Sequence, residues 1–183
     1  MTRQVLFIQG GGHGAHDKWD NKLVNSLSNE LGPGYTICYP VMPNEADPSY
    51  AAWKAALMKE FDVLKRDAML VGHSLGGTIL INVLTEWAPQ RAIGGIFIIA
   101  APFVGEGGWT SQDIEPRSDF AARLPPGIPI FLYHGREDEI APFKHVELYA
   151  QTIPSAHVRR LNGRDHQLNY DLSVVANDIR QLG

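Results

Sequence analysis

The sequence predicts an α/β fold of three layers, with helices on both faces of a doubly wound, mainly parallel sheet of about six strands. Short apolar runs typical of buried strands alternate along the chain with segments whose apolar residues recur at helical spacing. Such alternation favours parallel strands joined by right-handed helical crossovers. A length of 183 residues suits a single domain, residues 1–183, with a sizeable core.

The first half of the chain predicts three strands and three helices. The strands are expected over residues 3–9, 35–39 and 68–72, and the helices over 17–31, 49–66 and 75–88. Asp47 and Pro48 are expected to begin the second helix, because proline favours the first helical position. Asp17 is the expected N-cap of the first helix, whose apolar face contains Trp19, Leu23, Val24, Leu27 and Leu31.

The second half of the chain predicts three further strands and two longer helices. The strands are expected over residues 95–101, 129–134 and 157–161, and the helices over 143–152 and 172–182. Residues 102–127 form a small cap-like insertion, whose glycines and prolines leave room for one short helix around residues 118–123. An insertion this short borders a crevice without sealing it.

The composition is that of an ordinary globular chain. Hydrophobic residues make up 44% of it and charged residues 20%, with a formal net charge of -4 and no cluster of Lys and Arg. These values argue against nucleic-acid binding and against a membrane-spanning protein. Cys38 is the single cysteine, so the chain cannot form an internal disulfide, and it is expected to be a buried strand residue. The apolar run at residues 5–8 is too short for the core of a signal peptide. The expected location is the cytoplasm.

The segment Gly72-His73-Ser74-Leu75-Gly76 follows an apolar run and precedes a helical pattern. Gly-x-Ser-x-Gly in this context is typical of a nucleophile elbow, a sharp strand-to-helix turn that exposes the serine hydroxyl. Gly72 and Gly76 lie two residues either side of Ser74, where a Cβ would obstruct the close approach of strand and helix. The sequence therefore predicts Ser74 as a nucleophile.

A serine nucleophile needs a base to take its proton, and the chain has seven histidines. His166 is the expected base, because it lies in a polar loop after the last expected strand, at the edge of the sheet where Ser74 is expected. His73 is next to Ser74 in the sequence but is expected to point away from it at the elbow.

The base in turn needs a carboxylate that orients its ring. Asp138 is the expected acid, since it lies just beyond the fifth expected strand. Glu137 and Glu139 are the local alternatives to Asp138. Asp165 is a further alternative, although a residue beside His166 in the sequence cannot readily face its Nδ1 atom.

The loop Gln9-Gly10-Gly11-Gly12-His13-Gly14 follows the first expected strand and presents backbone amides with few side chains. The amides of Leu75 and Gly11 are the expected donors to an oxyanion, and Gly12 is an alternative to Gly11. His13 either lines the pocket or is solvated. The candidate substrate-binding residues are Gly12, His13, His73, Phe103 and Trp109.

These motifs resemble the α/β-hydrolase superfamily over nearly the whole chain. The glycine-rich loop, the elbow, residues 134–138 and His166 follow one another in that family's order. The short length, the turn at residues 40–44 and the helix containing Trp53 are more narrowly similar to the small retinoblastoma-binding-protein-type serine hydrolases. Gln9 stands where the superfamily usually has a histidine, and the first expected element of this sequence is a parallel strand, so the antiparallel hairpin that usually precedes it is not expected here.

The resemblance implies a minimal α/β-hydrolase fold and a serine hydrolase that cleaves an ester or similar acyl bond through Ser74, His166 and Asp138. A carboxylesterase (EC 3.1.1) is the expected class, although thioesterases, amidases and peptidases use the same residues. The expected substrate is a small, soluble, short-chain acyl compound. No cofactor, metal, nucleic acid or membrane is expected to take part.

Two other functions stay open as alternatives. Gly10, Gly12 and Ala15 fit a variant dinucleotide-binding pattern, but the second expected strand ends at Tyr39-Pro40 without the acid that would bind a ribose. A hydrolase-fold protein-interaction module with little activity is the second alternative. Three neighbouring residues are of metal-ligand type but are more typical of a solvated loop, namely His13, His16 and Asp17.

Overall fold

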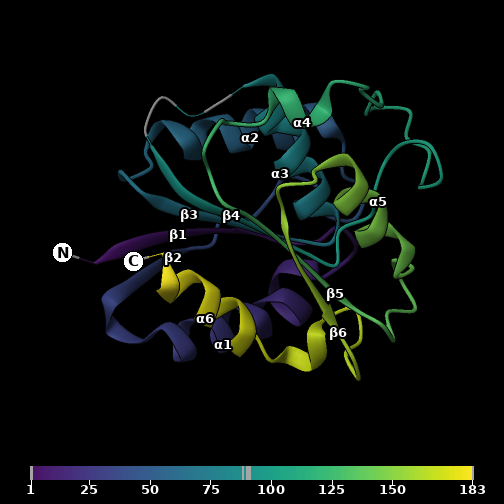
Figure 1. Ribbon diagram of the computed structural model, residues 1–183. Helices are drawn as coiled ribbons and strands as arrows, with labels where there is room; N and C mark the ends of the chain where they lie inside the picture. The colour runs from purple at the N-terminus through teal and green to yellow at the C-terminus, as the bar shows by residue number, and fades with distance from the viewer. Residues whose placement is uncertain (1, 88, 90–91, 183) are drawn as a thin grey trace.

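The computed structural model describes residues 2–87, 89 and 92–182, which form a six-stranded sheet between two layers of helices (Figure 1). The strands are β1 (Arg3–Ile8), β2 (Tyr35–Cys38), β3 (Ala68–His73), β4 (Ile93–Ile99), β5 (Ile130–Gly135) and β6 (His157–Leu161). Their order is β2-β1-β3-β4-β5-β6, and each neighbouring pair is parallel. The predicted fold class is confirmed.

Helices cover both faces of this sheet. One face carries α1 (Asn21–Leu31) and α6 (Ser173–Gln181), and the other carries α2 (Tyr50–Asp62), α3 (Leu75–Glu86) and α5 (Lys144–Thr152) (Figure 1). Val5 and Phe7 of β1 belong to the core beneath α1 and α6, whereas Leu6 and Ile8 belong to the core beneath α2 and α3. Side chains of a strand alternate between the two faces of the sheet, and both faces are buried here. The sequences of these strands are therefore continuous apolar runs.

The winding of the sheet reverses between β1 and β3. From β1 the chain crosses to β2 at one edge, and it then returns to β3 on the other side of β1. Ligands of open parallel sheets bind beyond the carboxyl ends of the strands at such a reversal. The two loops that follow β1 and β3 are the glycine-rich loop and the turn at Ser74, so the topology brings the two predicted parts of the site together.

The first helix begins differently from the prediction. Residues Ala15–Asp20 form a π-helix, η1, which starts after Gly14 (φ 77°) and leads into α1, so Asp17 is not an N-cap. The wider turn of a π-helix changes the angular position of the residues that precede α1. Trp19 is consequently 48% exposed instead of joining the core, whereas Leu23, Leu27 and Leu31 of α1 are buried.

Three further features of the fold differ from the prediction. Ser49, not Asp47, is the N-cap of α2, and its Oγ accepts a hydrogen bond from the Ala52 amide at 3.3 Å. Cys38 is only half-buried, because β2 is an edge strand, and its Sγ accepts a hydrogen bond from Gln4. The third predicted helix ends at Glu86, and its last expected residue, Ala88, lies outside the described residues.

The insertion at residues 102–127 contains α4 (Phe120–Arg123) and an isolated bridge between Val104 and Trp109. Its start is fixed to the domain, because the carbonyl of Pro102 accepts hydrogen bonds from Thr78 Oγ1 (2.6 Å) and Tyr149 Oη (3.0 Å). Two short 3₁₀ turns complete the fold: η2 (Gly32–Gly34) ends α1, and η3 (Leu168–Tyr170) precedes α6. Among the described helices, none has the length and apolar character needed to cross a membrane.

The start of β1 and the end of α6 lie side by side at the amino end of the sheet (Figure 1). Arg3 donates a hydrogen bond from Nη2 to the carbonyl of Leu182 at 3.4 Å. The carboxyl ends of the strands, where Ser74 follows β3, point the other way.

Candidate active site

Ser74 occupies a strained turn between β3 and α3. Its backbone has φ 52° and ψ -128°, a conformation that L-residues rarely adopt. A Cβ on Gly72 would lie 2.6 Å from the Cα of Gly77, and a Cβ on Gly76 would overlap the carbonyl oxygen of Gln9. Strand β3, helix α3 and the loop after β1 are thus packed backbone against backbone, as the glycine spacing predicts.

The structure brings Ser74, His166 and Asp138 into one chain of hydrogen bonds. The Nε2 atom of His166 lies 2.9 Å from Ser74 Oγ, and its Nδ1 atom lies 2.8 Å from Asp138 Oδ2. His166 and Asp138 are buried, whereas Ser74 is half-buried. A carboxylate on Nδ1 leaves Nε2 as the acceptor that faces the hydroxyl, which is the arrangement of a base and its nucleophile.

Asp138 is held from both of its oxygens. Oδ1 accepts the amides of Ile140 (2.9 Å) and Ala141 (2.8 Å), while Oδ2 faces His166 and, at 3.1 Å, Nε2 of His134. Burial raises the pKa of this carboxyl, but hydrogen bonds from the two histidines and from the Ala141 amide outweigh it and lower the pKa below its ordinary range. Asp138 is therefore ionised across the neutral pH range.

The alternative carboxylates make other contacts. Glu137 is exposed, and its Oε2 accepts the Arg164 amide at 3.0 Å. Asp165 uses Oδ1 to accept the Asn169 amide at 2.7 Å within its own turn. Glu139 is exposed to solvent. Of the four carboxylates that the sequence offers, Asp138 is the one that faces His166.

The amides of the glycine-rich loop differ in their partners. Gly10 donates to Oδ2 of Asp20 at 2.6 Å, and Gly12 donates to the carbonyl of Glu45 at 2.6 Å. The amides of Gly11 and Leu75 have no hydrogen-bond partner among the described residues. Gly11 lies against Leu75, since a Cβ on Gly11 would be 2.7 Å from Leu75 Cδ2. The two residues with unpaired amides are thus neighbours, whereas the amide of Gly12, the alternative donor, already donates to Glu45.

A cavity of about 390 Å³ opens above Ser74. Its lining includes Gly12, His13 and His73, three of the candidate substrate-binding residues, together with His166. Two exposed apolar side chains also line this cavity, Trp19 (48% exposed) and Ile140 (61% exposed). The sequence did not indicate these two, because Trp19 fits the helical core pattern and Ile140 is a lone apolar residue in an acidic turn.

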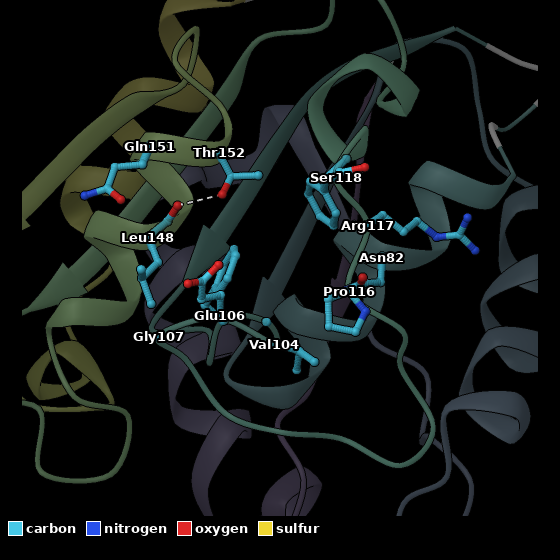
Figure 2. Close-up of a pocket in the computed structure, with 13 residues that line it drawn as sticks. Asn82, Val104, Glu106, Gly107, Pro116, Arg117, Ser118, Leu148, Gln151 and Thr152 are labelled. Atoms are coloured by element: carbon cyan, nitrogen blue, oxygen red, sulfur yellow. Dashed lines mark hydrogen bonds between the residues drawn. The ribbon is translucent and has the colours of Figure 1, made fainter.

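Phe103 and Trp109 lie elsewhere, so the expectation that they line the pocket of Ser74 is wrong. Phe103 lines a second cavity, of about 560 Å³, between the insertion and helices α3 and α5. Figure 2 shows side chains of the insertion facing those of α5 across this cavity, with the guanidinium of Arg117 directed away from it. Trp109 lines neither described cavity and packs edge-on against His145, with ring centroids 5.4 Å apart.

The histidine and aspartate beside the glycine-rich loop contact other protein groups. His16 stacks on Tyr39 at 4.1 Å between ring centroids, and its Nδ1 lies 2.6 Å from Oδ1 of Asp17. His13 is exposed at the mouth of the cavity.

Comparison with known proteins agrees with this architecture. The model of the Alpha/beta hydrolase family matches residues 5–178 of the chain. The ydeN gene product from B. subtilis is 22% identical, with a TM-score of 0.77 over 99% of this chain and 98% of that one. Alpha/beta hydrolase domain-containing protein 10 from mouse is 20% identical, with a TM-score of 0.70 over 100% and 90% of the two chains. Est1E from Butyrivibrio proteoclasticus is 14% identical, with a TM-score of 0.69 over 98% and 86%. No curated protein sequence matches the chain.

Proposed function

The chain belongs to the alpha/beta hydrolase family, and from this premise we propose that it is a serine hydrolase that cleaves carboxylic esters through an acyl-enzyme intermediate. The observation that carries the proposal is the chain of hydrogen bonds from Ser74 Oγ to His166 (2.9 Å) and from His166 to Asp138 (2.8 Å). The unpaired amides of Gly11 and Leu75 beside Ser74 support it.

The proposed reaction has two halves. Ser74 Oγ attacks the acyl carbon while His166 Nε2 takes its proton, and the amides of Gly11 and Leu75 stabilise the oxyanion that forms. Collapse of this intermediate expels the alcohol, which receives the proton from His166. A water molecule then attacks the acyl carbon while His166 takes its proton. The bond from this carbon to Ser74 Oγ breaks, His166 returns the proton to Ser74 Oγ, and the acid leaves. Asp138 holds the tautomer of His166 and stabilises its imidazolium form in both halves.

The lining of the cavity favours a compact, neutral ester. A volume of about 390 Å³ is at the small end of ligand pockets. The described lining includes no Lys or Arg to pair with an anionic substrate, and Trp19 and Ile140 offer apolar surface at its rim. We therefore propose that the substrate is an ester with a short acyl group. Trp19 and Ile140 would contact the apolar part of its acid or its alcohol. Thioesters and amides would pass through the same acyl-enzyme intermediate.

A fluorophosphonate probe tests the proposal, because it phosphonylates a serine only when a base activates it. We expect the wild-type protein to acquire one covalent label, which mass spectrometry of a digest places on Ser74. Ser74→Ala should abolish the label and reduce ester turnover by orders of magnitude, with a free energy of unfolding within about 1 kcal/mol of the wild type.

A matched control is Ser118→Ala, because Ser118 lines the second cavity and not the cavity of Ser74. This variant should label and turn over like the wild type. A folded wild-type protein that never acquires the label would contradict the proposal and favour the protein-interaction alternative. Equal ester turnover by wild type and Ser74→Ala in pure preparations would do the same.

A further inference from the structure

A second aspartate-histidine pair lies behind Ser74. Asp20 is the last residue of the π-helix η1, and His73 is the last residue of β3. The Nδ1 atom of His73 lies 2.9 Å from Asp20 Oδ2, and its Nε2 atom lies 3.0 Å from the carbonyl oxygen of His166. Both side chains are only 2% exposed, so water does not compete for these hydrogen bonds.

The partners of His73 determine its protonation state. A carboxylate oxygen and a backbone carbonyl oxygen only accept hydrogen bonds, whereas a neutral imidazole has a single N–H to donate. A neutral His73 would therefore direct a lone pair at one of two buried oxygens, at a substantial energetic cost. Burial alone lowers the pKa of His73, but the charge and hydrogen bond of Asp20, together with the carbonyl of His166, raise it above its ordinary value.

The same carboxylate reaches the glycine-rich loop. Oδ2 of Asp20 also accepts the amide of Gly10 at 2.6 Å. Gly10 in turn lies directly against the nucleophile, since a Cβ on Gly10 would be 3.1 Å from the Cβ of Ser74. Asp20 and His73 thus connect three segments that are distant in the sequence, namely η1, the loop after β1 and the loop that carries His166.

We propose that Asp20 and His73 form a buried ion pair that positions Gly10 and His166 around Ser74 and keeps His166 in its neutral, basic form. This inference rests on the proposed function, because it assumes that His166 is the base. Asp20 and His73 are positioning residues, as they act through Gly10 and His166.

The electrostatic part of the proposal follows from the groups around His166. The ring centroids of His73 and His166 are 5.0 Å apart, so a positive charge on His73 opposes a second one on His166. His134 on β5 acts in the same direction, and Asp138 acts in the opposite one. Burial is the largest influence, and the net result lowers the pKa of His166 below its ordinary value. The phenols of Tyr39 and Tyr170, which also sense the charge of Asp20, are uncharged at neutral pH.

The pH dependence of kcat/KM tests this inference, because a purely structural role would lower activity without moving the profile. In His73→Gln, the cation is lost while the carboxylate of Asp20 stays, and both effects favour protonation of His166. We expect the acid limb of kcat/KM for p-nitrophenyl acetate to move to higher pH by roughly one unit. The control His157→Gln removes an exposed histidine on β6 and should leave the limb in place.

A spectroscopic measurement keeps the proposal testable if His73→Gln does not fold. In ¹⁵N-histidine NMR, we expect one imidazole to keep both of its nitrogens protonated above neutral pH. His16 and His166 also have both nitrogens near oxygen atoms. The signal is therefore assigned to His73 by its persistence in the His16→Gln and His166→Gln variants.

Each outcome has a separate meaning. An unmoved acid limb in a folded His73→Gln protein, or a His73 with one protonated nitrogen at neutral pH, would overturn the ion pair. If Ser74 does not react with the fluorophosphonate, the proposed function fails, whereas the NMR measurement still reports the state of His73 independently.

Discussion

At the scale of single residues, Asp138 is the most constrained group of the site. Two amides bind one of its oxygens and two histidines face the other. These contacts hold the carboxylate in position, and each of them also favours its ionised form. The sequence predicted Asp138 from its place after a strand, but nothing in the sequence pattern indicated that His134 also faces it. That contact depends on the path of the loop between Asp138 and Ala141.

Replacing Asp138 tests its orienting role. In Asp138→Asn the amide side chain favours the wrong tautomer of His166, and we expect turnover to fall by about 10⁴-fold, as for the same change in a serine protease triad. Glu137→Gln removes the charge from the neighbouring carboxylate, which contacts the Arg164 amide and not His166. Its turnover should stay near that of the wild type. Equal losses in the two variants, measured as kcat for the same ester, would mean that Asp138 is not the orienting acid.

The lowered pKa of His166 predicts the pH profile of the wild type. The base is active only when it is neutral, so activity rises with pH as His166 loses its proton. Since its pKa lies below the ordinary 6.5, the midpoint of the acid limb of kcat/KM should lie below pH 6.5. A midpoint above pH 6.5, with the protein shown by circular dichroism to be folded throughout, would contradict this reading of the site.

At the scale of secondary-structure elements, the elbow depends on how closely α3 approaches the backbone of β1. Gly76 lies in the first turn of α3, directly beneath the carbonyls of Ile8 and Gln9. The sequence predicted this requirement from the spacing of the glycines around Ser74. It failed at the start of α1, because a π-helix replaces one α-helical turn there and moves Trp19 from the core to the cavity.

Gly76→Ala is the substitution that this packing excludes most strongly. The new methyl group would overlap backbone atoms of Gln9, which cannot move without displacing the glycine-rich loop. We expect a loss of about 3 kcal/mol or more in the free energy of unfolding, measured by urea denaturation. The control Gly34→Ala adds a methyl group where no atom lies within 4 Å and should be neutral or stabilising by up to about 1 kcal/mol. Similar denaturation midpoints for the two variants would show that the elbow tolerates a side chain.

At the scale of the whole molecule, the sequence predicted the sheet better than it predicted the surroundings of the site. Apolar runs identify the strands because each strand is buried on both faces, and the bounds of β6 at His157–Leu161 agree with the prediction. The contact between Asp20 and His73 joins residues 53 positions apart, and local patterns carry no information about such pairs. Phe103 and Trp109 were misplaced for the same reason, since the insertion folds toward α5 and not over Ser74.

An insertion that folds toward α5 leaves the cavity of Ser74 open, which predicts the choice of substrate. We expect the rate of hydrolysis of p-nitrophenyl esters to be highest for acetate and butyrate and to fall for longer chains. A cavity of about 390 Å³ has little room for them. The rate should not jump when an ester exceeds its solubility limit. A jump at that limit, or a preference for long chains, would show that the insertion acts as a lid.

The hydrogen bond between Arg3 and Leu182 has a practical consequence for handling the protein. Because β1 starts and α6 ends next to one another, a tag or a surface linker attached near either end of the described chain emerges from the same side of the molecule. The opening above Ser74 lies at the other end of the strands. A molecule attached to a surface near either of these ends therefore turns its cavity away from that surface. Ser74 should be equally accessible in the two cases.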